Sequence, residues 1–199
     1  MPYFVAIGAS GSRGLTDLRQ LLSLMPREVG AAILVVLHRP IGRVSYSRDV
    51  LSKVSSMPVV IAKMGGQFAA GSCYVGEPSE HLTLAANGVI HLISGARGEY
   101  RNRTADLLFA SVALQAKERA VGVVLAGSLD DGSRGLAAIR HAGGTTMVVA
   151  SEHPPVKGMP ENARLHADPV HFVGTTSQIA TAIVAHTGRE HSSWEQSTA

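Results

Sequence analysis

Residues 3–18, YFVAIGASGSRGLTDL, place an apolar segment directly before a glycine-rich turn and a helical pattern. The turn contains Gly8, Gly11 and Gly14, with Ser10 between the first two. A buried strand that runs through a short turn into a helix is typical of an α/β fold. The turn predicts one of two functions. Its backbone N–H groups could bind a phosphate at the helix N-terminus, or a sharp bend could present Ser10 as a nucleophile.

The composition is that of an ordinary globular domain. The chain has 199 residues, of which 45% are hydrophobic and 17% charged, which suits one domain with a real core. We expect no membrane insertion, because no apolar run reaches the ~18 residues of a spanning helix, and the N-terminus lacks the basic region of a signal peptide. A single cysteine, Cys73, has no partner for an internal disulfide, which favours a cytoplasmic location.

Charge and histidine patterns argue against two further classes of function. The net charge of +3 comes from scattered Lys and Arg, and aromatic residues make up 5% of the chain, so no nucleic-acid surface is expected. The nine histidines form no helical pair with an adjacent glutamate, and there is no paired-cysteine motif. We therefore predict neither a metal site nor a cofactor.

Further short apolar runs predict the rest of the sheet. They are rich in Val and Ile and show little alternation, which is typical of strands buried on both faces of a parallel sheet. These runs are residues 32–37, 58–62, 121–126, 146–150 and 171–173. Between several of them, apolar residues recur at helical spacing. They are Leu15, Leu18, Leu22 and Met25; Val50, Leu51 and Val54; Leu107, Ala110 and Leu114; Leu136, Ile139 and Ala142; and Ile179, Ile183 and Val184.

One region interrupts this alternation of strands and helices. Residues 72–93 hold short strands around Asn87-Gly88, a strong signal for a tight hairpin turn. We therefore expect an α/β protein with a doubly wound, mostly parallel sheet flanked by helices and an antiparallel hairpin at one edge. The domain should span residues 1–187. Residues 188–199 form a polar tail that contains Trp194, a partly packed aromatic residue or a docking anchor.

Polar residues follow three of the predicted strands. Ser10 ends the first strand, His38 ends the second, and Asp130 and Asp131 follow the run at residues 121–126. Serine, histidine and aspartate are the three parts of a nucleophilic triad, and the carboxyl ends of parallel strands meet at one edge of a sheet. Each also has a structural interpretation, since serine and aspartate cap helices and a histidine at a strand end can bond the backbone.

The phosphate-binding interpretation has less support. Gly8, Gly11 and Gly14 give the spacing G-x-x-G-x-x-G rather than G-x-G-x-x-G, and no P-loop motif occurs. The carboxylate expected about 20 residues later for a ribose has only Glu28 as a candidate, in a predicted loop.

Several segments together resemble the catalytic domain of the chemotaxis receptor methylesterase family, CheB. In the family's order they are VAIGAS, VVLHRP, CYVGEPSEHLTL, TADLLFASVA, AVGVVLAGSLDDGSRGLAAIRHAGGTTMVVA and VKGMPENA. The resemblance implies hydrolysis of glutamate methyl esters on the cytoplasmic helices of methylated chemoreceptors, and in some members deamidation of receptor glutamines. It implies Ser10 as nucleophile, His38 as base and Asp131 as its partner, with Asp130 outside the triad. The N–H of Gly11 is the expected oxyanion donor.

Departures from the family pattern cluster around this site. The turn has one extra residue at Ser12-Arg13, Arg39 stands where the family often has methionine, and Ser128 replaces a methionine. We expect Arg13 and Arg39 to help select an acidic receptor surface. Members of the family usually carry a receiver domain ahead of the catalytic one, and this chain is expected to be a stand-alone form. Two alternatives remain open: an esterase-like module that binds a receptor or signalling partner with little or no activity, and a nucleotide-binding domain.

Overall fold

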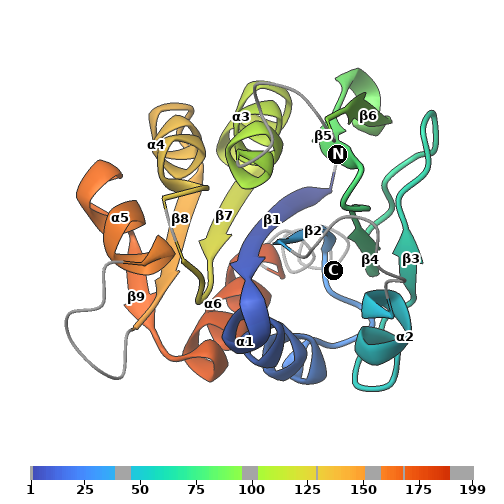
Figure 1. Cartoon of the computed structure of the whole chain (residues 1–199), viewed down its shortest axis with the longest axis horizontal. Coiled ribbons are helices and arrows are strands. Elements are labelled where there is room, and N and C mark those ends of the chain that lie inside the picture. Colours follow the sequence, from blue (N-terminus) through green and yellow to red (C-terminus); the bar gives the residue numbers. More distant parts are fainter. Residues whose placement is uncertain are drawn as a thin grey trace, which may run out of the picture.

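The described part of the chain contains a central sheet of seven parallel strands. The computed structural model describes residues 2–38, 46–95, 103–128, 130–150, 158–167 and 169–188. The strands are β1 (Tyr3–Ser10), β2 (Ala31–His38), β3 (Val59–Ile61), β4 (Ser72–Val75), β7 (Ala120–Val124), β8 (Thr145–Val149) and β9 (Phe172–Gly174). Their order is β3-β4-β2-β1-β7-β8-β9, with β1 in the centre (Figure 1). The chain winds outward from β1 in both directions, so the predicted doubly wound class is confirmed.

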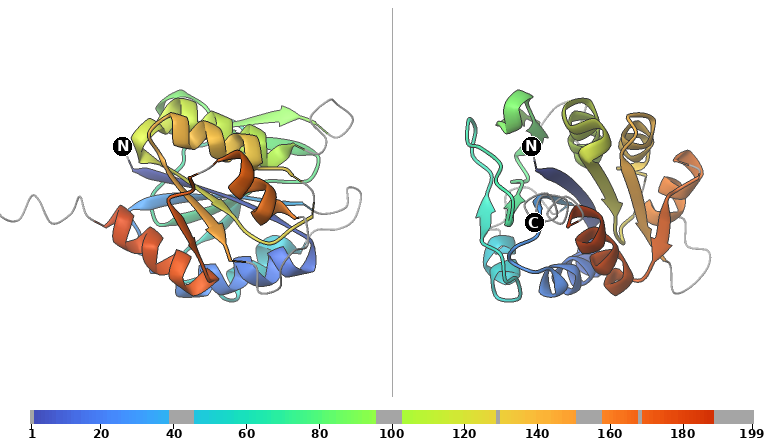
Figure 2. Two further views of the ribbon diagram at one scale, coloured as in Figure 1. Left: turned by 90° about the vertical axis from the view of Figure 1, so that its left-hand side faces the viewer. Right: turned by 180° about the vertical axis from the view of Figure 1, so that it is seen from behind.

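Helices cover both faces of the sheet, as Figures 1 and 2 show. One face carries α1 (Gly11–Leu24), α2 (Ser47–Ser52) and α6 (Thr176–Thr187), and the other carries α3 (Thr104–Ala116), α4 (Ser133–His141) and α5 (Met159–His166). None of the described helices is both long and apolar enough to cross a membrane. Each face of the sheet therefore has its own hydrophobic core, which explains why the strands read as continuous apolar runs.

Alternation along β1 decides where its last residue points. Val5 and Ile7 belong to the core under α1 and α6, whereas Phe4 and Ala6 belong to the core under α3 and α4. Successive side chains of a strand point to opposite faces. Ser10, at an even position like Phe4 and Ala6, therefore points to the α3 and α4 face.

The antiparallel hairpin is a separate two-stranded sheet of β5 (Glu80–Leu84) and β6 (Ile90–Ser94). Asn87 and Gly88 between them have φ values of 59° and 77°, and positive φ at both positions is what a type I′ turn requires. The predicted hairpin is confirmed for these two strands. Its expected start at residue 72 was wrong, because Ser72–Val75 pairs in parallel with β2 and β3 inside the main sheet.

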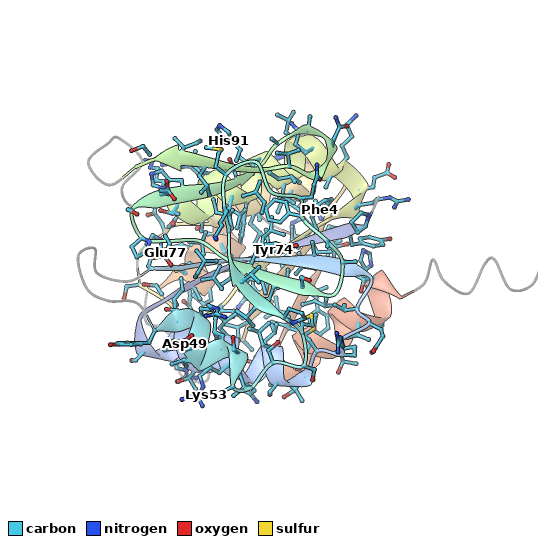
Figure 3. The ribbon with its side chains drawn as sticks, turned by 90° about the vertical axis from the view of Figure 1, so that its right-hand side faces the viewer. Phe4, Asp49, Lys53, Tyr74, Glu77 and His91 are labelled. Atoms are coloured by element: carbon cyan, nitrogen blue, oxygen red, sulfur yellow. The ribbon has the colours of Figure 1, made fainter. Side chains whose placement is uncertain are left out.

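Aromatic side chains fill the layer beside this hairpin. Phe68 contacts Phe4 and Tyr74 edge to face, with ring centroids 6.2 and 4.9 Å away. In Figure 3, Phe4 and Tyr74 lie between His91 of β6 at the top and the residues of α2 at the bottom. The hairpin therefore closes the α3 side of the sheet over β2 and β4, where the helices leave it open.

The helices differ from the sequence predictions in two places. Helix α3 forms, but it buries Leu108, Phe109 and Val112, while Leu114 is 71% exposed. The sequence had predicted that the stripe through Leu107, Ala110 and Leu114 is buried. This was wrong, because another face of this apolar helix packs against the core. Helix α5 was not predicted at all, because its sequence MPENARLH has few apolar residues.

Candidate functional site

Ser10 and His38 end neighbouring strands at the same level. They are register partners in the parallel pair of β1 and β2, so their backbones lie about 4.8 Å apart. Leu34 and Val36 of β2 belong to the α3-side core, and His38 continues their face as Ser10 continues that of β1. The two side chains therefore point to the same side of the sheet. Within the described residues, Ser10 Oγ forms no hydrogen bond, including none to His38.

None of the residues that the structure describes forms a hydrogen bond with the Ser10 hydroxyl group. Ser10 occupies the N-cap position of α1, as its structural interpretation expected, but its side chain makes no capping bond. Its N–H donates to the Ala126 carbonyl oxygen at 3.0 Å. Gly11 follows with a φ of +68°, a left-handed conformation that favours glycine. Helix α1 thus begins directly at the serine, and the first N–H groups of a helix lack intrahelical partners.

The carboxylate partner of His38 is Asp131, which follows β7 on the opposite side of the central strand β1. The Nε2 atom of His38 is hydrogen-bonded to Asp131 Oδ2. Asp131 is 2% exposed, and its two oxygens also accept the N–H groups of Ala105 at 2.8 Å and Asp106 at 2.9 Å in the first turn of α3. Asp130 is exposed. The structure therefore brings Asp131 to the histidine, and the ring leaves Nδ1 for a second partner.

Two further residues near Asp131 were missed by sequence reasoning. Asp106 Oδ1 accepts the Gly135 N–H at 2.8 Å in the first turn of α4, and burial raises the pKa of Asp106. His81 is 4% exposed, and its Nδ1 is hydrogen-bonded to Thr104 Oγ1 at 3.0 Å. Burial lowers the pKa of His81, while the negative charge of Asp131 acts in the opposite direction.

The sequence carried a weak signal for Asp106 and none for His81. Asp106 lies in the first turn of a predicted helix, a position explained by the helix dipole alone. His81 lies in the short strand of a hairpin, where nothing nearby in sequence shows that the first turn of α3 will pack against it.

A cavity of about 370 Å³ opens beside Ser10 at the carboxyl ends of β1, β7 and β8. It lies where the winding of the sheet changes direction, the usual place for a ligand in such folds. Its lining includes the predicted residues Gly11, Ser12, Arg13 and Ser128, together with Asp17, Ala126, Gly127, Val149, Ala150, Gly158, Pro160 and Glu161. The remaining predicted residue, Arg39, lies outside the described residues, as does the tail from residue 189 onward, including Trp194.

Charges in this cavity are partly paired. Arg13 Nε lies 3.8 Å from Asp17 Oδ1, and the other oxygen of Asp17 accepts the Ala126 N–H at 3.2 Å. Among the described residues, no three His, Cys, Asp or Glu side chains are grouped so that they could hold a metal ion.

The fold and this edge define a doubly wound α/β protein that assembles serine, histidine and aspartate at the carboxyl ends of its central strands. Residues 5–183 match the family model for CheB methylesterase, and the chain belongs to that family.

Relatives of known name and structure support this assignment. The chain is 35% identical over 162 residues to the protein-glutamate methylesterase/protein-glutamine glutaminase of Escherichia coli K12, a match that covers 80% of this chain and 46% of that protein. The enzyme of the same name from Symbiobacterium thermophilum is 35% identical over 156 residues, 78% of this chain and 43% of the relative. The chain thus spans about half the length of these relatives.

A related domain of known crystal structure has the same fold. The catalytic domain of the Thermotoga maritima CheB methylesterase superposes with a TM-score of 0.83 at 25% sequence identity. The match covers 94% of this chain and 99% of that domain.

Proposed function

We propose that the chain hydrolyses glutamate methyl esters on the cytoplasmic helices of chemoreceptors, with Ser10, His38 and Asp131 as its catalytic residues. The observation that carries the proposal is the hydrogen bond between His38 and Asp131. It lies at the same edge and on the same face of the sheet as Ser10, whose hydroxyl group makes no capping bond. Family membership and the names of the relatives support the substrate class.

The orientation of the histidine ring supports different roles for its two nitrogens. Because Nε2 is bonded to Asp131, Nδ1 is the atom that takes the Ser10 proton. The two residues are register partners on the same face, so we expect a change of the Ser10 rotamer to bring Oγ within reach of this nitrogen. Asp131 holds the ring in place and stabilises the imidazolium that forms.

The reaction proceeds through a covalent intermediate. Ser10 Oγ attacks the ester carbonyl, and the imidazolium of His38 returns its proton to the methoxy group, which leaves as methanol. A water molecule then attacks the glutamyl-serine ester, giving up one proton to His38, which passes it to Ser10 Oγ as the acyl–oxygen bond breaks. The glutamic acid side chain leaves and releases its remaining acidic proton to solvent, becoming a carboxylate. The N–H of Gly11 at the start of α1 stabilises the oxyanion, a contribution of about 3 kcal/mol in comparable sites. A glutamine side chain would follow the same steps and release ammonia.

The second candidate is an esterase-like module that binds a receptor without turning it over. It is favoured by one observation, the lack of a hydrogen bond between Ser10 Oγ and His38. A nucleotide-binding domain would also leave Ser10 unreactive.

A fluorophosphonate probe followed by mass spectrometry separates these candidates. We expect labelling of Ser10 in the wild type and in the Ser12→Ala variant, and loss of labelling in Ser10→Ala and His38→Ala. Ser12 is the matched control because it is the next serine in the same turn. Release of methanol from methylated receptor membranes should follow the same pattern. An unlabelled Ser10 in a folded wild-type protein would exclude the esterase.

A further inference from the structure

Glu161 places a carboxylate in the cavity beside the nucleophile. It lies in the first turn of α5 and lines the 370 Å³ cavity together with Ser10. Its carboxylate makes no hydrogen bond or ion pair with the described residues. Neither the triad nor the oxyanion donor uses this residue.

Close glycine contacts show how near this carboxylate is to Ser10. A Cβ built on Gly158 would lie 3.3 Å from Glu161 Oε2 and 2.7 Å from the Gly127 carbonyl oxygen. A Cβ built on Gly127 would lie 2.7 Å from Ser10 Cβ. Gly158 thus lies against both Glu161 and Gly127, and Gly127 lies against Ser10, so two adjacent glycines connect the carboxylate to the nucleophile.

The described residues of the cavity carry an excess of negative charge. Its described ionisable residues are Arg13, Asp17 and Glu161. Arg13 is adjacent to Asp17, at 3.8 Å, so these two charges largely compensate each other. Glu161 is left as the charge that an incoming substrate meets, in a hollow where water screens it less than on an open surface.

We propose that Glu161 determines which methyl esters this site takes: it favours glutamyl esters flanked by a basic residue and disfavours those flanked by acidic residues. This proposal rests on the proposed esterase function. A methyl ester is itself neutral, so the difference between two substrates comes from the charges next to it. A carboxylate in the cavity attracts a neighbouring ammonium or guanidinium group and repels a neighbouring carboxylate.

The same charge acts on the product. Hydrolysis converts the neutral ester into a carboxylate beside Glu161, and two carboxylates in one cavity repel each other. Glu161 should therefore weaken binding of the product peptide and favour its release. Product affinity gives a second measurement that does not depend on the flanking residues.

This proposal and the expectation for the arginines predict opposite preferences. Arg13 and Arg39 were expected to select an acidic receptor surface, whereas Glu161 selects against one. In the described part of the cavity, Arg13 already has Asp17 beside it, so the negative charge dominates there.

The test compares three peptides that carry one glutamyl methyl ester flanked by lysine, glutamine or glutamate. They are assayed with the wild type, Glu161→Gln and Glu118→Gln. The control removes the same charge from an exposed turn that precedes β7, at the opposite end of the sheet from Ser10. We expect the wild type and Glu118→Gln to prefer the lysine peptide over the glutamate peptide by about tenfold in kcat/KM at low salt. In Glu161→Gln this ratio should fall close to one, and the product peptide should inhibit more strongly.

The readout is a ratio, so a general loss of activity in Glu161→Gln does not affect it. A wild type that prefers the glutamate peptide, or a ratio that Glu161→Gln leaves unchanged, would overturn the assignment while leaving the esterase function in place. A small neutral ester tests that function separately. If the wild type and Ser10→Ala hydrolyse it equally slowly, the esterase proposal fails, and this one fails with it.

Discussion

Asp131 and Asp106 hold the first turns of each other's helices. Asp131, which lies just before α4, accepts the N–H of Asp106 in α3 at 2.9 Å. Asp106 in turn accepts the N–H of Gly135 in α4 at 2.8 Å. The carboxylate that contacts His38 is therefore part of the packing between two helices, and its position depends on both of them.

The exchange Asp131→Asn tests which aspartate serves His38. Asp131 Oδ2 is bonded to both His38 and Ala105, and Oδ1 is bonded to Asp106. An amide nitrogen cannot accept a hydrogen bond, so asparagine loses either the Asp106 bond or the other two bonds. In both cases it lacks the negative charge that stabilises the imidazolium. Turnover should fall by as much as ~10⁴, the cost of the same exchange in another triad enzyme. Asp130→Asn alters an exposed carboxylate and should retain activity. Steady-state kinetics of both variants decide the matter, and a defect confined to Asp130→Asn would contradict the assignment.

Removing the Asp106 side chain should destabilise the packing of α3 and α4. The Gly135 N–H then loses its acceptor, and the loss of a comparable capping bond costs about 1 kcal/mol. Urea unfolding of Asp106→Ala should show this decrease in the free energy of unfolding. Asp106→Asn keeps an oxygen acceptor and should lose less. Equal stability of Asp106→Ala and the wild type would show that the bond contributes nothing.

The buried imidazole of His81 makes stability depend on pH. Burial lowers its pKa from the usual 6.5, so just below pH 6.5 the unfolded state binds a proton that the native state does not. The free energy of unfolding therefore rises with pH across this window and falls on acidification. His81→Gln should remove part of that slope in urea titrations at several pH values.

His171 provides a comparison for this measurement. Its pKa is also lowered by burial, and it contacts Thr146 of β8, far from the hairpin that holds His81. His171→Gln should remove its own share of the slope, and the effects of the two exchanges should add. A slope unchanged by His81→Gln would show that this histidine is protonated equally in both states.

Cys73 should be unreactive in the folded protein. It is fully buried in β4, and burial raises the pKa of its thiol to about 12. The thiolate is the reactive form of cysteine. In the native state at pH 8 the thiol stays protonated, and burial keeps reagents away from it. A chromogenic disulfide reagent should react with Cys73 only at the rate of unfolding, and immediately in urea. Rapid reaction without denaturant would contradict the burial.

The sheet was predictable because its strands are buried on both faces. Runs such as residues 32–37 and 121–126 have the composition of parallel strands. His38 directly follows the first of these runs, and Asp131 lies a short loop after the second. The helices were harder to predict. In α3, apolar residues surround most of the helix, so periodicity did not separate the stripe through Leu108 and Val112 from the exposed one through Leu114.

The missed features depend on contacts between distant segments. Helix α5 has few apolar residues to show a helical period, although its Pro160 is well tolerated in the first turn of a helix. His81 bonds to Thr104, and Asp106 bonds to Gly135, across layers that the sequence pattern does not place next to each other. Local composition predicts which residues end a strand. It does not predict which helix turn will pack above them.

The central place of β1 has a consequence for biosynthesis. Its partner β2 follows closely, so a chain leaving the ribosome carries Ser10 and His38 on neighbouring strands early. Asp131 is 93 residues further along than His38, and α3 and β7 must be made before it. We expect nascent chains that end before β7 to hold the proposed nucleophile and base without the carboxylate of Asp131. Reactivity toward esters would then arise only when most of the domain has been translated.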